Sequence, residues 1–193
     1  MKLRIRYNAP VLLTFSLVAL AVHVIDATAV PGLTGRWFTL PGWFDWTHAP
    51  NYLRLVTYTL GHSDWEHLLG NLPIVLLLGA FVEDKYGSRD ILAMTLVTAL
   101  VAAVLNALLF ESGLRGASGV VFMLIVLASL GNVRRGELPL TFVLVAGFFL
   151  AGEILASRQP DRTAQWAHMV GGVVGGVFGL LIGPHRGGGG SGE

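Results

Sequence analysis

The sequence contains no cysteine and few charged residues. The missing cysteines exclude a disulfide, a thiol nucleophile and a cysteine-ligated metal. Of its 193 residues, 13% are charged and 53% are hydrophobic, whereas a soluble domain is about one quarter charged. The net charge of +1 argues against a nucleic-acid partner, and the sequence shows no nucleotide-binding loop. We therefore expect an integral membrane protein.

Apolar runs separated by charged and turn residues predict six membrane-spanning helices. The fold class is accordingly an all-α six-helix membrane bundle, with one domain over residues 1–186. The glycine-rich segment 187–193 is expected to be a flexible tail without a fold of its own, typical of an appended linker. The six expected spans cover residues 10–30, 63–82, 90–110, 117–133, 138–157 and 163–183.

The distribution of lysine and arginine predicts a cytoplasmic N-terminus. In that orientation eight basic residues lie on the inner side and five on the outer side, as the positive-inside rule requires. All five tryptophans then fall on the outer side. The compact chain shows no organelle-targeting segment, which favours a bacterial inner (cell) membrane.

The first apolar run has a second interpretation. A basic start followed by Ala27-Thr28-Ala29 also fits a cleaved signal peptide. The length of the run, with His23 and Asp26 just before that point, favours a retained helix. The segment that follows, residues 31–62, is rich in Trp, Phe, Pro and Gly, so we expect an irregular element half-sunk in the outer leaflet.

Four polar residues lie near the outer ends of the predicted helices. The second, fourth and sixth helices all begin on the outer side, and their first turns hold His67 and Asn71, Ser118, and His168 respectively. Polar groups within a membrane span are costly and usually functional. The six-helix order alone therefore brings these residues into one leaflet.

The fourth predicted helix is short. About 17 residues separate Ala117 from Arg134, which is about 25 Å of helix against a hydrocarbon core of about 30 Å. With its inner end held by Arg134 and Arg135, its outer end should lie below the membrane surface. Ser118 would then sit in a depression, reached by irregular backbone over 112–116 that must line a cavity.

Ser118 lies within Gly116-Ala117-Ser118-Gly119 at this helix start. Unpaired backbone N–H groups and the positive end of the helix dipole would stabilise an oxyanion formed there. His168 is the candidate base that a serine nucleophile requires, so we expect a Ser–His dyad. Glu153 is a doubtful third member. A helix-capping serine and a structural histidine are the alternative interpretations.

Further residues could support such a site. Glycines repeat every fourth residue after His168, including Gly171 and Gly175, which permits close helix contact in lipid. His67 and Asn71 share a helix face and could supply oxyanion donors, or could make an ordinary interhelical contact. A zinc site is not expected, because the sequence has no His-Glu-x-x-His spacing.

Together these motifs resemble the rhomboid family of intramembrane serine proteases. The resemblance covers most of the chain, and each motif is weak alone but stands in the family's order. The motifs are His67-Leu68-Leu69-Gly70-Asn71 for His-x-x-x-Asn, Glu83 to Ser88 for Glu-x-x-x-Gly-Ser, Gly116-Ala117-Ser118-Gly119 for Gly-x-Ser-Gly, and Ala167-His168 with Gly171 and Gly175 for Ala-His-x-x-Gly-x-x-x-Gly.

The resemblance implies cleavage of transmembrane protein substrates within the lipid bilayer, without a cofactor, metal or nucleotide. It implies Ser118 as nucleophile, His168 as base, and His67, Asn71 and the Ser118 N–H as the oxyanion hole. Gly116 and Gly119 flank the serine, and Phe122 matches an aromatic position that stacks on the histidine.

Two details of the resemblance bear on the first loop and on substrate entry. Arg54 matches the arginine of the family's Trp-Arg pair, but here Leu53 precedes it, which predicts a loop held differently. We expect substrate to enter laterally past the fifth helix and a cap over 157–165, with Phe148 and Phe149 in the wall.

Two other function classes differ from a protease in what they require of the sequence. A non-catalytic rhomboid-like protein that binds membrane clients is the alternative, against which the intact Ser118 and His168 argue. A small transporter or channel would require inverted repeats and polar residues near the midplane. Neither feature is evident in the sequence.

Overall fold

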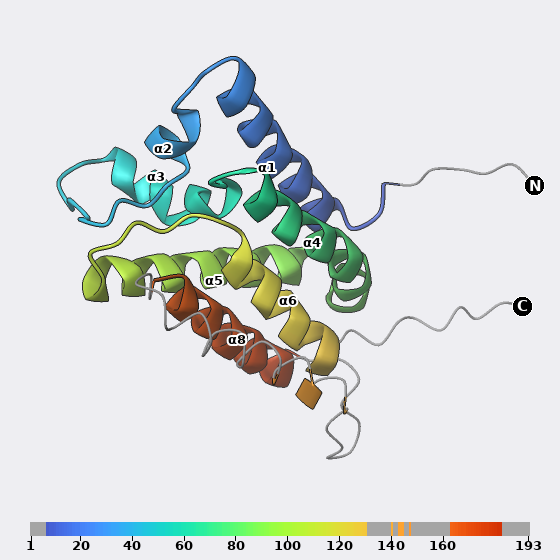
Figure 1. The fold of residues 1–193 in the computed structure, drawn as a ribbon. Helices are drawn as coiled ribbons and strands as arrows, with labels where there is room; N and C mark the ends of the chain where they lie inside the picture. The colour runs from blue at the N-terminus through green and yellow to red at the C-terminus, as the bar shows by residue number, and fades with distance from the viewer. Residues whose placement is uncertain (1–6, 131–139, 141–142, 145–146, 148–162, 183–193) are drawn as a thin grey trace, which may run out of the picture.

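The structure, a computed structural model, describes residues 7–130, 140, 143, 144, 147 and 163–182. Within these residues the regular structure is helical, apart from one isolated β-bridge. Figure 1 shows α1 and α4 crossing near one end of the molecule, with α6 and α8 side by side at the other. The helices are α1 (Pro10–Thr28), α2 (Leu33–Trp37), α3 (Pro50–Thr57), the 3-10 helix η1 (Tyr58–Leu60), α4 (Trp65–Tyr86), α5 (Ser88–Leu109), α6 (Ser118–Leu130) and α8 (Thr163–Leu181).

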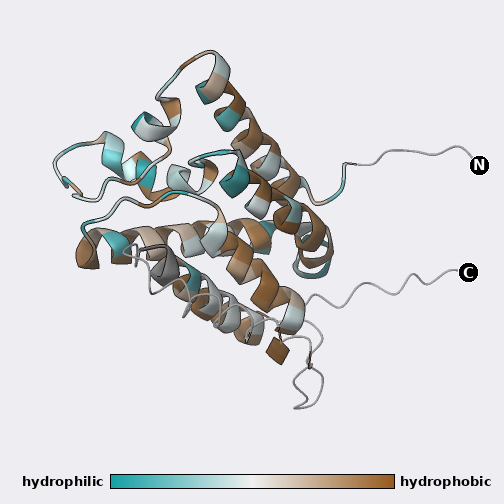
Figure 2. Ribbon diagram, in the orientation of Figure 1, coloured by the Kyte–Doolittle hydropathy of each residue, from teal (hydrophilic) through white to brown (hydrophobic). Residues whose placement is uncertain are grey.

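Three of these helices, α1, α4 and α5, are long and apolar enough to cross a membrane. The helices α6 and α8 are apolar but shorter over their described residues. Large apolar side chains on α1, α4, α5 and α8 are exposed, such as Leu17, Leu77, Leu108 and Val173, and Figure 2 shows hydrophobic residues along much of α1, α4 and α5, with paler residues between them on α8. Extended exposed apolar surface of this kind suits lipid rather than water.

The break predicted between the second and third spans is much shorter than expected. The sequence suggested that the second span ends at Val82, but α4 continues through Glu83 to Tyr86. The Glu83 carboxylate accepts hydrogen bonds from the backbone N–H groups of Val11 and Leu12, at 2.9 and 3.0 Å. These N–H groups lie in the first turn of α1 and have no helical partner, so the charge of Glu83 is compensated and the helix need not end there.

The turn between α4 and α5 is a single glycine. Gly87 has a φ of +83° and separates Tyr86 from Ser88, where α5 begins. A left-handed backbone at this position favours glycine, because other residues are strained there. The helical hairpin is therefore tighter than the predicted charged loop.

The predicted irregular first loop contains three helical segments, α2, α3 and η1. Pro50 occupies the first turn of α3, a position that proline favours. Arg54 joins α3 to α2: its guanidinium donates to the Arg36 carbonyl oxygen and to Asn51 Oδ1. Although Leu53 departs from the family's pattern, Arg54 still holds the loop through these hydrogen bonds. Trp43, on the surface of the loop, is 80% exposed.

The core of the molecule is built around α6. Its residues from Gly119 to Leu124 are all buried, which fits a helix that is apolar on every face. Leu12 of α1, Val75 of α4 and Met94 of α5 pack into the same cluster. The fourth predicted helix is thus surrounded by the others, and its start at Ser118 lies within one residue of the predicted Ala117.

The fifth predicted span, 138–157, lies outside the described residues except for four helical positions, 140, 143, 144 and 147. Glu153, Phe148, Phe149 and the cap over 157–165, apart from the backbone at the start of α8, also fall outside them.

Candidate active site

A cavity of about 530 Å³ opens at the start of α6. Its lining brings together the four polar residues that the sequence placed in one leaflet, from α4, α6 and α8. Ser118 and His168 therefore face one shared cavity. The complete lining is Ser63, His67, Gly70, Asn71, Gly113, Leu114, Arg115, Ser118 and His168.

Backbone hydrogen bonds hold the irregular segment that leads into Ser118. Leu114 exchanges two bonds with Leu40 of the first loop, at 2.9 and 3.0 Å, forming the isolated β-bridge. The Gly116 N–H donates to the Tyr58 carbonyl oxygen at 2.9 Å. Asn106 Nδ2, near the end of α5, donates to the Ser112 carbonyl oxygen at 3.0 Å. The first loop and α5 thus provide hydrogen-bond partners for backbone groups of this segment, which lipid could not provide.

Gly116 is required by its conformation and by its neighbour. Its φ of +115° is one that side chains rarely adopt. A Cβ atom there would also lie 2.6 Å from both Cε1 and Nε2 of His67. The absent side chain lets the His67 ring lie directly against the backbone that precedes Ser118.

The start of α4 orients His67. The Asp64 side chain caps the helix by accepting the His67 N–H at 2.8 Å. That bond, with a second from the Ser63 hydroxyl, lowers the pKa of the Asp64 carboxyl. Ser63 Oγ lies 3.1 Å from His67 Nδ1. The ring is thereby held at Nδ1, with its Nε2 edge toward Gly116.

Asn71 lies one turn further along the same face of α4. Its Nδ2 donates to the His67 carbonyl oxygen at 2.8 Å, and the residue is buried although it lines the cavity. An amide nitrogen carries two hydrogens, so one donor remains for another acceptor.

Glycines set the distance between α6 and α8. A Cβ atom on Gly171 would collide with the Gly119 carbonyl oxygen, and one on Gly119 would lie 3.1 Å from the Ala167 carbonyl oxygen. Gly175 lies against Met123, where a Cβ would be 3.0 Å from the Met123 Cα. The two backbones are thus in direct contact beside Ser118 and His168, as small residues allow in lipid.

Phe122 lies on the side of α6 that faces α8. Its ring is buried, and a Cβ on Gly172 would collide with it. The ring therefore lies against the α8 backbone one turn after His168. Stacking of Phe122 on the His168 ring stays a prediction.

Several cavity residues were not singled out from the sequence: Ser63, Gly70, Gly113, Leu114 and Arg115. Ser63 and Gly70 could have been found by their spacing from His67 and Asn71 on α4. The other three lie in irregular backbone, whose path the sequence does not reveal. His62 is a further buried residue, 1% exposed, whose ring meets the His67 ring edge-on with centroids 5.0 Å apart.

His62 has an unusual environment for a histidine. Within the described residues neither of its ring nitrogens has a hydrogen-bond partner. Burial, assisted by repulsion from His67, lowers the pKa of His62 from its ordinary 6.5 to about 4. The ring is therefore neutral at physiological pH. No cluster of three or more potential metal ligands occurs in the described residues.

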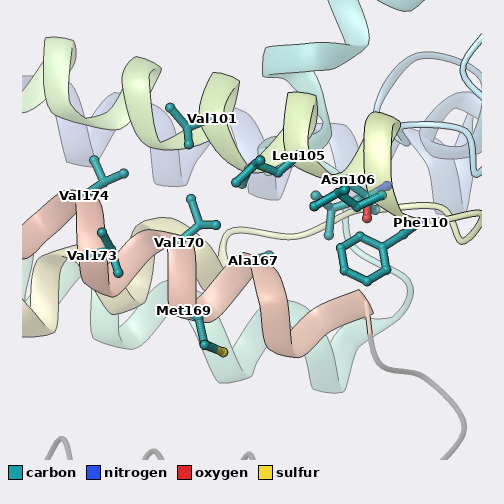
Figure 3. Close-up of a pocket in the computed structure, with 12 residues that line it drawn as sticks. Val101, Leu105, Asn106, Phe110, Ala167, Met169, Val170, Val173 and Val174 are labelled. Carbon is teal, nitrogen blue, oxygen red and sulfur yellow. The ribbon is translucent and has the colours of Figure 1, made fainter.

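A second hollow lies on the other side of α8. Figure 3 shows an apolar groove between α5 and α8, where Val101 and Leu105 face Val170 and Val174. Its volume is about 290 Å³. Leu114 lines both this groove and the Ser118 cavity, so the two hollows share this residue in their walls.

These observations define a helical membrane protein with a polar cavity shared by a serine and a histidine from two contacting helices. Residues 49–185 match the family model described as Rhomboid domain, and the chain belongs to the rhomboid family. It is also similar to Rhomboid-like protein 11, chloroplastic, of Arabidopsis thaliana, with 28% identity over 112 residues. That match covers 57% of this chain, which spans only 40% of the relative's length.

Proposed function

We propose that the protein is an intramembrane serine endopeptidase that cleaves transmembrane segments of membrane proteins. The observation that carries the proposal is the common cavity of Ser118 and His168, which lie on different helices. Membership of the rhomboid family supports it, because that family includes serine proteases.

In the proposed reaction, His168 removes the proton from Ser118 Oγ as the oxygen attacks a peptide carbonyl. The oxyanion accepts hydrogen bonds from the Ser118 N–H and the Asn71 side chain, and from His67 when its ring is also protonated at Nε2. The tetrahedral intermediate collapses, the C–N bond breaks, and the amine leaves with the proton from His168. Water, deprotonated by His168, then hydrolyses the acyl-enzyme and releases the carboxylic acid product and Ser118.

The polar lining of the cavity supports access of the water that this reaction consumes. The substrate segment must unwind locally, because a helix hides its carbonyl groups. We propose that the protein lies in the bacterial inner membrane with its N-terminus in the cytoplasm. The cavity then opens to the outer side of that membrane. Entry past the fifth predicted helix belongs to the same proposal.

The test uses the full chain reconstituted in nanodiscs with a model transmembrane substrate. Ser118→Ala and His168→Ala should each lower cleavage by about 1,000-fold or more, and Ser118→Ala should abolish labelling by a fluorophosphonate. Ser129→Ala is the matched control, because Ser129 lies on α6 and donates to the Ile125 carbonyl oxygen instead. Cleavage that persists in either variant would refute the dyad.

The same assay separates the alternative of a non-catalytic, client-binding protein. A protein of that class would bind the substrate segment but show neither cleavage nor labelling at Ser118. The labelling of wild-type protein therefore decides between the two classes.

A further inference from the structure

Arg115 lies at the edge of the Ser118 cavity and has no role in the mechanism above. Its side chain is exposed and lines the cavity together with Ser118 and His168. The backbone is fixed on both sides of it, because Leu114 pairs with Leu40 and Gly116 bonds to Tyr58. The structure therefore fixes the backbone of Arg115, from which the guanidinium extends, relative to the serine.

Arg115 brings a permanent positive charge to the described lining of the cavity. That lining contains no acidic residue among the described part of the chain. Asp64, just before α4, lies outside the lining and accepts the His67 N–H and the Ser63 hydroxyl. An anion that enters the cavity would thus meet the positive charge of Arg115, with no carboxylate of the described lining beside it.

We propose that Arg115 selects substrates that carry an aspartate or glutamate within a few residues of the scissile bond. The inference rests on the proposed function and deepens it. A carboxylate is costly to place at membrane depth, and a guanidinium offsets that cost through paired hydrogen bonds. Segments with such an acid would be stabilised in the cavity, and segments with a lysine there would be repelled.

A lipid phosphate would be recognised by the same guanidinium chemistry. The position of Arg115 favours the substrate, because its side chain shares one lining with Ser118 and His168. The experiment includes lipid composition as a variable so that the two occupants are distinguished.

The test compares three model substrates that differ at one position near the scissile bond: aspartate, asparagine and lysine. The position is scanned over three residues on each side. In phosphatidylcholine nanodiscs, kcat/KM for wild type should favour aspartate over asparagine by about 3–10-fold at one position. Arg115→Gln should bring that ratio near one, and Arg115→Glu should favour lysine. Arg89→Gln, an exposed arginine at the start of α5, is the matched control and should keep the wild-type ratio.

The three substrates are also bound to the Ser118→Ala protein, with affinity as the readout. This arm tests Arg115 even if the protein proves not to be an enzyme, so failure of the proposed function and of this inference are distinguishable. Equal aspartate-to-asparagine ratios in wild type and Arg115→Gln would overturn the inference. An equal loss on all three substrates, or an Arg115 effect seen only with anionic lipids, would also overturn it.

Discussion

The two hollows beside α8 differ in how they are built. The Ser118 cavity, of about 530 Å³, is lined by polar side chains and by backbone from the irregular segment before α6. The groove toward α5, of about 290 Å³, is lined almost wholly by apolar side chains. Adjacent residues of α8 face opposite hollows: Ala167 lines the groove and His168 lines the cavity.

The difference lies in what fixes each shape. Around the cavity, glycines bring backbone against backbone, and hydrogen bonds hold the segment before Ser118. Around the groove, flexible side chains such as Leu105 and Met169 define the walls. Backbone contacts cannot yield to an added methyl group, whereas side chains can change rotamer. The cavity should therefore be far more sensitive to small substitutions.

Among the substitutions that test this difference between the hollows, Gly171→Ala should lower activity most. In Gly171→Ala the new Cβ would collide with the Gly119 carbonyl oxygen, so α8 must move away from α6. A displacement of about 1 Å at a catalytic pair can cost about 100-fold in rate, and overpacking costs about 1–3 kcal/mol in stability. We expect a fall of that order in cleavage and fluorophosphonate labelling.

Gly176→Ala provides the control for this substitution. Gly176 lies on the same helix, and a Cβ there meets no described heavy atom within 4 Å. Its cleavage rate should stay close to wild type. If both variants lose activity equally, helix propensity rather than backbone contact sets the shape of the cavity.

The sequence predicted the elements of this region better than their connections. Helix parity and the positions of His67, Asn71, Ser118 and His168 placed these residues in one leaflet, and they do line one cavity. The path of residues 112–116 was predicted only as irregular backbone. Its partners, Leu40 and Tyr58, are distant in sequence and bind through backbone atoms, which leave no side-chain signal.

The other end of α4 shows the opposite error. The run of charges from Glu83 onward predicts the end of the second span, because charged residues are costly in lipid. The structure compensates Glu83 by the start of α1, 71 and 72 residues away in the chain. A local pattern cannot reveal such a partner, so the helix boundary was wrong although the helix itself was predicted.

A second, smaller effect is a pH dependence of stability that should arise beside the cavity and not beside the groove. His62 lies against His67, with a pKa lowered by burial to about 4, while the described residues that line the groove include no titratable side chain. In the unfolded chain the His62 side chain binds a proton as the pH falls through about 6.5, whereas the folded His62 does not. The free energy of unfolding therefore has its full contribution from neutral His62 above that pH. It should fall by about 1–2 kcal/mol between pH 7 and pH 5.

Thermal unfolding in detergent at several pH values measures this loss. His62→Gln should reduce the pH dependence, whatever the stability of the variant itself. His48→Gln changes an exposed histidine of the first loop and should leave the slope intact. An unchanged slope in His62→Gln would show that another group titrates.

The smallest effect is expected on the groove side of the comparison. Val173→Phe places a larger apolar side chain at the edge of the groove, where Val173 is 66% exposed. Val173 does not line the cavity, and exposed apolar positions tolerate added volume by a change of rotamer. The cleavage rate of the model substrate should therefore change by less than about 3-fold. A loss of tenfold or more, with unchanged thermal stability, would mean that the groove takes part in substrate binding. The two hollows would then be one functional site, and Leu114 would be a contact within it rather than a wall.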